Sequence, residues 1–130
     1  MPAKILVVDD DDDIRRIASL ALQRIGGFEV VLAAHGAEAV ELALADVPDL
    51  VLLDVTMPEM DGPATLRALR AQEATARVPV VFFTATSSEA EVARLVGLGA
   101  AGVVPKPFEV QELPRRVRQI LRDLGYHGAG

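Results

Sequence analysis

Short apolar runs alternate with segments of helical periodicity along the whole chain. Four of the runs are nearly unbroken and a fifth is weaker; in chain order they are Ile5–Val8, Phe28–Ala33 (the weaker run), Leu50–Leu53, Val78–Phe83 and Gly102–Val104. Short continuous runs that are rich in β-branched residues are typical of strands buried on both faces of a parallel sheet.

The segments between these runs predict helices. Apolar residues recur at spacings of three and four over Ile14–Ile25, and the Gly26-Gly27 pair should end this first helix. A second helix is expected over about Gly36–Ala45. A third should start near Asp61, with a proline in its first turn, where a missing N–H group is harmless.

Two further helices complete the pattern. Ser88 and Glu91 have the spacing of a capping box at the start of the fourth. The last covers roughly residues 110–124, and Pro114 should distort its first turn or delay its start. Alternating strands and helices with short connections predict an α/β fold: a five-stranded parallel sheet of order 2-1-3-4-5 with helices on both faces.

Composition and charge limit the possible functions. The chain has 130 residues, about half of them apolar, which suits one domain with an aliphatic core. It has no cysteine, no signal-peptide pattern and no apolar run near the roughly 18 residues of a membrane span. The net charge of −6 argues against direct nucleic-acid binding. We therefore expect a soluble cytoplasmic protein that binds neither membranes nor nucleic acids directly.

Polar groups follow four of the five predicted strands. Asp9 and Asp10 end the first strand, Asp54 the third and Thr84 the fourth, while Lys106 stands between two prolines after the fifth. In the predicted strand order these four strands are contiguous, and the carboxyl ends of parallel strands share one edge of the sheet. Three carboxylates, a hydroxyl and an ammonium group should therefore meet there.

This combination of groups points to metal-assisted phosphoryl chemistry. Crowded carboxylates must share protons or a cation, and an all-oxygen ligand set favours Mg²⁺ or, alternatively, Mn²⁺. Lys106 and Thr84 would have no task in a pure metal site, but they suit the oxygens of a transferring phosphoryl group. Asp54, the lone acid that ends the central strand, is the best candidate for a nucleophile that forms an aspartyl phosphate.

Other charged residues have simpler interpretations. Asp11, Asp12 and Asp13 are expected to be helix caps and surface charge at a helix N-terminus. A cluster of arginines should form the solvated face of the last helix, with a partner surface as the alternative: Arg115, Arg116, Arg118 and Arg122. His35 and His127 should face solvent without a role.

Several motifs resemble the receiver domains of bacterial response regulators. The segment "DVTMPEMDG" at Asp54–Gly62 resembles their phosphoacceptor segment, "ILVVDDD" their acidic pair, "FFTA" their switch threonine and "GLGAAGVVPKPF" their Lys-Pro turn, and "HGAEAVELA" reads like their second helix. The resemblance spans about residues 4–124 and implies the flavodoxin-like receiver fold. Four motifs in order, each at the end of the appropriate strand, make it specific.

The resemblance also implies roles for individual residues. Asp54 would take a phosphoryl group from the phosphohistidine of a sensor kinase or a histidine phosphotransfer protein. The metal ligands would be Asp10 directly, Asp9 mainly through water, Asp54, and the backbone carbonyl of Thr56. Lys106 and Thr84 would hold the phosphoryl oxygens.

The resemblance also makes predictions for the backbone and the switch. Lys106–Pro107 would be a cis peptide, and Gly62 would have a backbone conformation that is closed to other residues. Two positions depart from the family pattern: Val103 stands where an aromatic switch residue is common, and Pro105 removes a backbone donor before the lysine. Thr56 and Thr86 would tune the lifetime of the aspartyl phosphate.

Three functions compete at this level. The first is a phosphorylation-controlled signalling module, namely a chemotaxis-type, single-domain receiver, and the second is a degenerate receiver that acts only as a binding scaffold. An aspartate-nucleophile phosphatase of the haloacid-dehalogenase kind is the third, but it needs an aspartate where Thr56 stands. Residues 1–124 are expected to form the receiver and residues 125–130 a flexible tail, with no output domain present. The tail favours a natural chain end, and the alternative is a receiver cut from a longer chain. Downstream, the partner would be a protein target or an output domain.

Overall fold

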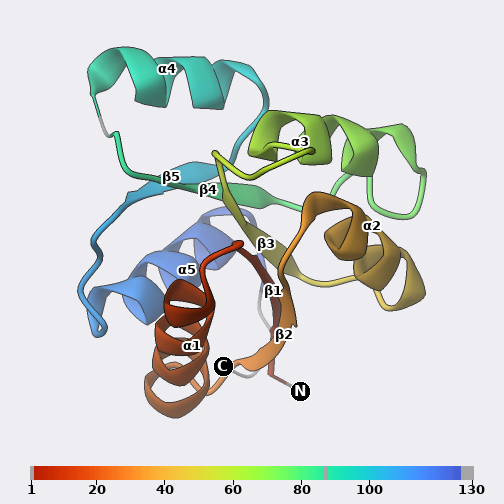
Figure 1. Cartoon of the computed structure of the whole chain (residues 1–130). Helices are drawn as coiled ribbons and strands as arrows, with labels where there is room; N and C mark the ends of the chain where they lie inside the picture. The colour runs from red at the N-terminus through yellow and green to blue at the C-terminus, as the bar shows by residue number, and fades with distance from the viewer. Residues whose placement is uncertain (1, 87, 127–130) are drawn as a thin grey trace.

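The computed structural model describes residues 2–86 and 88–126, and its core is one parallel sheet (Figure 1). Five strands pair in the order β2-β1-β3-β4-β5, which confirms the predicted fold class. The strands are β1 (Lys4–Val8), β2 (Glu29–Ala33), β3 (Leu50–Asp54), β4 (Val80–Thr84) and β5 (Gly102–Pro105).

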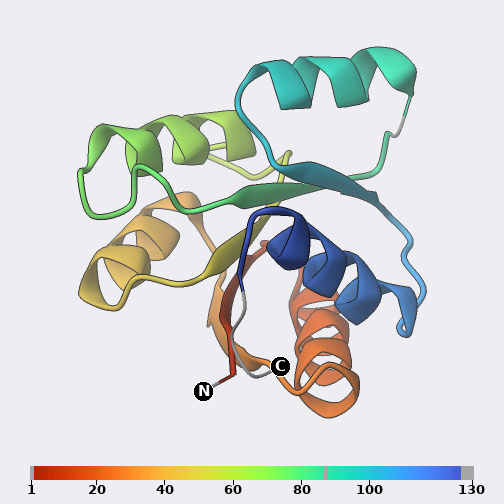
Figure 2. The same ribbon diagram turned by 180° about the vertical axis from the view of Figure 1, so that it is seen from behind.

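Helices cover both faces of this sheet. They are α1 (Asp12–Leu20), α2 (Gly36–Ala45), α3 (Gly62–Ala71), α4 (Glu89–Gly97) and α5 (Glu112–Asp123). α1 and α5 pack on one face, and α2, α3 and α4 on the other (Figures 1 and 2). Leu52 packs with the first group and its neighbour Leu53 with the second. Both sides of β3 are therefore buried, which explains its unbroken apolar sequence.

The first helix differs in detail from the prediction. α1 begins at Asp12 and gives way to a π-helical turn, η1, over Ala21–Ile25. The N–H group of Gly26 reaches back five residues to the carbonyl of Ala21, at 3.1 Å. Gly27 has a φ of 72°, a conformation that favours glycine, so the glycine pair ends the helix as predicted.

The predicted starts of α3 and α5 are confirmed, and the predicted capping box of α4 is confirmed only in part. The Asp61 carboxylate accepts a hydrogen bond from the N–H of Ala64 at 2.8 Å, which makes it the N-cap of α3. Ser88 accepts one from the N–H of Glu91 at 3.2 Å, but the Glu91 side chain pairs with Arg94 instead of completing the capping box. α5 begins late, at Glu112, as expected from a proline in its first turn.

The C-terminal segment continues beyond the last helix. Gly125 has a φ of 87°, and the N–H of Tyr126 donates to the carbonyl of Leu121 at 2.8 Å. Tyr126, which we expected in the flexible tail, packs against the apolar cluster under α1 and α5. The rest of the predicted tail, with His127, lies outside the described residues. No described helix combines the length and apolar character that a membrane span requires.

Candidate functional site

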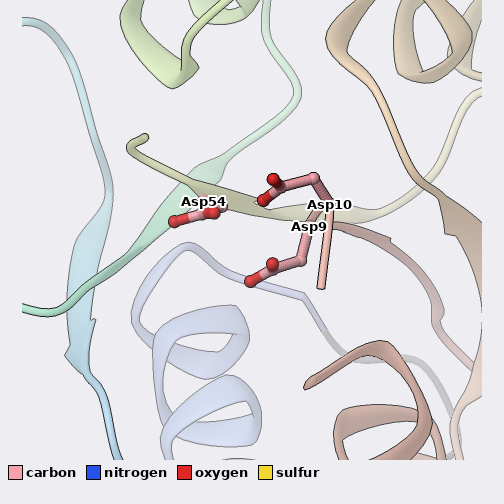
Figure 3. Close-up of side chains that lie close together, drawn as sticks. All are labelled: Asp9, Asp10 and Asp54. Atoms are coloured by element: carbon pink, nitrogen blue, oxygen red, sulfur yellow. The ribbon is translucent and has the colours of Figure 1, made fainter. Parts of the chain in front are cut away.

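Three carboxylates converge at the carboxyl end of the sheet. Asp9 and Asp10 follow β1, Asp54 ends β3, and each offers an oxygen within 4.8 Å of the oxygens of the other two (Figure 3). Asp9 and Asp54 are buried, whereas Asp10 is exposed. β1 and β3 are paired neighbours, so the fold itself brings these acids together.

Backbone contacts hold the loop that carries the acidic pair. The N–H of Asp9 donates to the carbonyl of Ala33 in β2 at 3.2 Å. One oxygen of Asp9 accepts from the N–H of Asp11 at 2.9 Å. Asp11 in turn caps α1 by accepting from the N–H groups of Asp13 and Ile14, which confirms its predicted role.

Lys106 reaches the buried acids from the end of β5. Its Nζ lies 2.7 Å from Asp9 Oδ2 and 3.2 Å from Asp54 Oδ1. The Lys106–Pro107 peptide is cis, as the motif implied. Pro105 has no N–H group, and the N–H of Lys106 donates to the carbonyl of Thr84 at 2.8 Å. This hydrogen bond fixes the backbone of Lys106 against the end of β4.

Burial and mutual repulsion set the electrostatics of this cluster. Burial, followed by the charge of Asp9, raises the pKa of Asp54 to about 6, although Lys106 opposes the shift. Burial lowers the pKa of Lys106, but the hydrogen bonds and charges of Asp9 and Asp54 outweigh it, so the net pKa is raised. Lys106 is therefore charged at neutral pH, and Asp54 is mostly ionised.

The cluster has the properties of a site for a hard divalent cation. The donors are all oxygens, and two buried carboxylates face a single ammonium group. Asp9 Oδ2 is buried and no donor other than the Lys106 ammonium contacts it among the described residues. No described residue donates a hydrogen bond to the Asp10 carboxylate. These residues fit Mg²⁺, with waters completing its shell.

Thr84 stands at the same edge but outside the charged cluster. Its buried hydroxyl donates to the carbonyl of Thr86 at 2.8 Å and accepts from the N–H of Thr86 at 3.0 Å. Thr56 is exposed, and its N–H lies 3.4 Å from Asp54 Oδ1. That the Thr56 carbonyl is a metal ligand stays a prediction.

Val103, at the position of the aromatic switch residue, is buried in β5. It packs in the apolar cluster on the side of α2, α3 and α4, together with Phe82 and Leu95. Its carbonyl accepts a hydrogen bond from Arg116 of α5 at 2.9 Å.

Gly62 is required for space and not for backbone freedom, so the predicted reason for this glycine was wrong. It is absent from the residues of positive φ, and the left-handed residue of its loop is Glu59, with a φ of 67°. A Cβ atom on Gly62 would lie 2.4 Å from the carbonyl oxygen of Asp54. The start of α3 thus packs directly on the backbone of the candidate nucleophile.

The arginines of α5 do not all face solvent. Arg118 donates to the carbonyl of Gly26 at 2.8 Å, as Arg116 does to Val103, so the helix is anchored at two points. Arg115, Arg116 and Arg122 are exposed, as expected for a solvated face, and Arg118 is half-buried. His35 is an exposed residue just before α2 and contacts no group of the candidate site among the described residues.

Sequence reasoning missed one residue that contacts this site. Arg15 lies in α1, and its guanidinium donates to the backbone carbonyl of Asp9 at 2.6 Å and to the Asp12 carboxylate. The spacing of three between Asp12 and Arg15 indicates such a pair on a helix. The contact with Asp9 depends on how the loop folds back, which the spacing does not show.

The model of the response regulator receiver domain family matches residues 5–118. The chain belongs to this family. Receiver domains are the response-regulator part of two-component systems, and as a family they generally bind Mg²⁺ in an acidic pocket. This receiver has an acidic cluster, formed by Asp9, Asp10 and Asp54.

Individual relatives agree with this assignment. The receiver is 43% identical over 119 residues to the probable transcriptional regulator ycf27 of Cyanophora paradoxa, covering 92% of this chain and 48% of the relative. It is 44% identical over 119 residues to the transcriptional regulatory protein CpxR of Escherichia coli, covering 92% of this chain and 49% of the relative. The chain thus spans about half the length of the curated relatives it matches.

The chemotaxis protein CheY4 of Vibrio cholerae superposes with a TM-score of 0.87 at 34% identity, covering 93% of this chain and all of that one.

Proposed function

We propose that this receiver accepts a phosphoryl group on Asp54 in an Mg²⁺-dependent reaction and that the modification switches its binding to partners. The donor would be the phosphohistidine of a sensor histidine kinase or a histidine phosphotransfer protein. The observation that carries the proposal is the contact of a buried Asp54 with Lys106 beside two further acids.

The residues divide the chemistry among them. An oxygen of the Asp54 carboxylate attacks phosphorus, a new O–P bond forms, and the P–N bond to the donor histidine breaks. The leaving imidazole keeps the bonding electron pair and takes up a proton. Asp9 and Asp10, with the Thr56 carbonyl, would hold Mg²⁺, which supplies positive charge to the phosphoryl oxygens. Lys106 neutralises the same oxygens, and its ion pair with Asp54 positions its ammonium group for this.

Thr84 would act after the transfer. A hydroxyl has one hydrogen, so Thr84 can donate to a phosphoryl oxygen only by releasing the carbonyl of Thr86. The aspartyl phosphate carries roughly −1.5 to −2 charges where the ionised carboxylate carried one, and its oxygens are strong acceptors, which favours this exchange. α4 and β5 would then favour a second arrangement, and the population would shift toward it. Val103 lies beneath the same helix, but its short side chain limits an aromatic type of coupling.

The wider context of the module is part of the same proposal. Residues 1–124 would form one cytoplasmic receiver unit, which acts on a downstream protein or on an output domain. The names of two relatives describe transcriptional regulators, which supports an output domain in a longer protein. The length and fold of CheY4 support a receiver that acts alone through protein contact.

The test is phosphorylation by a small donor. The protein is incubated with Mg²⁺ and acetyl phosphate, and the intact mass is compared with those of Asp54→Asn and of a Mg²⁺-free sample. We expect one added phosphoryl group in the wild type only, and only with metal. No addition under any condition would contradict the proposal for small donors, and a failure to bind Mg²⁺ as well would favour the scaffold function.

A further inference from the structure

Arg15 and Arg16 are adjacent in the sequence but have different surroundings. The Arg15 side chain is 17% exposed, and its guanidinium contacts the carbonyl of Asp9 through Nη1 and the Asp12 carboxylate through Nη2. The Arg16 side chain is 73% exposed, and its nearest acid, Asp13, lies 3.9 Å away. Arg15 alone is therefore folded back over the loop that leaves β1.

The position of the Asp9 carbonyl determines where the acidic pair points. This carbonyl belongs to the peptide group that joins Asp9 to Asp10, so its direction defines the last backbone dihedral of Asp9 and the first of Asp10. Two other hydrogen bonds hold Asp9: its N–H donates to the carbonyl of Ala33, and its carboxylate accepts from the N–H of Asp11. Asp10 is exposed, and none of the described residues donates to its carboxylate. The orientation of Asp10 thus depends on the peptide that Arg15 holds.

We propose that Arg15 is a positioning residue for the candidate metal site, an inference that rests on the proposed function. By clamping the Asp9–Asp10 peptide between the end of β1 and the start of α1, it keeps the Asp10 carboxylate directed toward Asp54. Some residues hold metal ligands in position without contacting the metal themselves. Their removal commonly lowers metal affinity by about 10- to 100-fold. A fixed guanidinium suits this task, since its planar fork holds two acceptors in one geometry.

Charge and geometry make opposite predictions for this residue. Arg15 is a cation close to a site for another cation, so its charge alone disfavours metal binding. If Arg15 acted only through charge, its removal would tighten Mg²⁺ binding. If it positions Asp10, removal weakens binding in spite of the lost repulsion. The sign of the change therefore separates the two roles.

The experiment is a Mg²⁺ titration of four proteins, followed by the chemical shifts of backbone amides: wild type, Arg15→Met, Arg15→Lys and Arg16→Met. Arg16→Met is the matched control, because it removes the same charge one residue away without touching the Asp9 carbonyl. Thermal unfolding in the presence of EDTA shows that each variant is folded at the temperature of the titration. Arg15→Lys keeps the positive charge but lacks the planar guanidinium that contacts two acceptors. If Arg15→Met is unfolded, the comparison of Arg15→Lys with Arg16→Met tests the proposal instead.

We expect Arg15→Met to weaken Mg²⁺ binding by about 10-fold or more, Arg15→Lys to weaken it less, and Arg16→Met to leave it equal or slightly tighter. If neither Arg15 variant binds Mg²⁺ more weakly than Arg16→Met does, Arg15 does not position the site. A wild-type protein that binds no Mg²⁺ would overturn the proposed function as well, and so the two failures are distinguishable.

Discussion

The two halves of the candidate site differ in how far they are assembled. At the ends of β1, β3 and β5, the buried carboxylates of Asp9 and Asp54 and the half-buried ammonium group of Lys106 are already in contact. At the end of β4, which lies between β3 and β5, the hydroxyl of Thr84 is satisfied by the backbone of its own loop. The difference teaches that buried charges must find partners across the fold, while a hydroxyl is satisfied by the nearest backbone group.

The charged half of the site contains more negative than positive groups. Two buried carboxylates share one ammonium group, and burial, followed by the charge of Asp9, raises the pKa of Asp54. The threonine half carries no such imbalance. The charged half should therefore respond strongly to changes of charge, pH and metal, and the threonine half weakly.

The largest effect is expected from Lys106→Met in the charged half. At pH 8 this change leaves two buried carboxylates without a cation and should lower the free energy of unfolding by about 3 kcal/mol, the low end for broken buried pairs. Denaturant unfolding in EDTA measures it, and added Mg²⁺ should restore part of the loss. Lys4→Met is the control, because Lys4 pairs with the largely exposed Asp46 and its loss should matter less. Equal losses in both variants would contradict the picture of a buried cluster.

A smaller effect of opposite sign is expected from Asp54→Asn. The folded pKa of Asp54 is raised from 3.8 to about 6, so the folded state holds its proton more tightly than the unfolded state. The contribution of protonated Asp54 to the free energy of unfolding is therefore lost as the pH rises from about 4 to 6. The shift corresponds to about 3 kcal/mol before solvent screening is taken into account. Asparagine resembles the neutral acid, so the free energy of unfolding of metal-free Asp54→Asn should exceed that of wild type by about 2 kcal/mol at pH 8 after this discount.

The pH dependence provides the check on this prediction. The advantage of Asp54→Asn should shrink at pH 5 and vanish below pH 4, where wild-type Asp54 is protonated in both states. Denaturant unfolding in EDTA at three pH values measures it. An advantage that stays constant with pH would show that the charge of Asp54 is not its cause.

The smallest effect is expected from Thr84→Val in the neutral half. This change removes two hydrogen bonds to the backbone of Thr86, which is exposed and can bond to water instead, so the loss should be about 1 kcal/mol. Mg²⁺ affinity should stay within about twofold of wild type, because the hydroxyl lies outside the charged cluster. Thr84→Ser, which keeps the hydroxyl, is the control. A large loss of Mg²⁺ affinity in Thr84→Val would contradict this separation and show that the hydroxyl and the charged cluster act together in metal binding.

Much of the fold could be predicted because its signals are local. The strand segments, the glycine stop at Gly27 and the start of α3 near Asp61 depend on residues a few positions apart. The π-helical turn of η1 was not foreseen, since apolar spacing does not distinguish four-residue from five-residue hydrogen bonds. The capping box at Ser88 failed in part because Glu91 had Arg94 as a competing partner.

The gathering of the site residues could also be predicted, but not their contacts. Asp9, Asp10, Asp54 and Lys106 meet because parallel strands of known order end at one edge. The sequence by itself determined this meeting, because strand periodicity and strand order decide which ends are neighbours. Only the tertiary structure decided that Gly62 packs on Asp54, that Thr84 bonds to its own loop and that Arg15 holds the Asp9 carbonyl. These contacts depend on distances of a few ångströms between loops, and such distances follow from the packing of the whole domain.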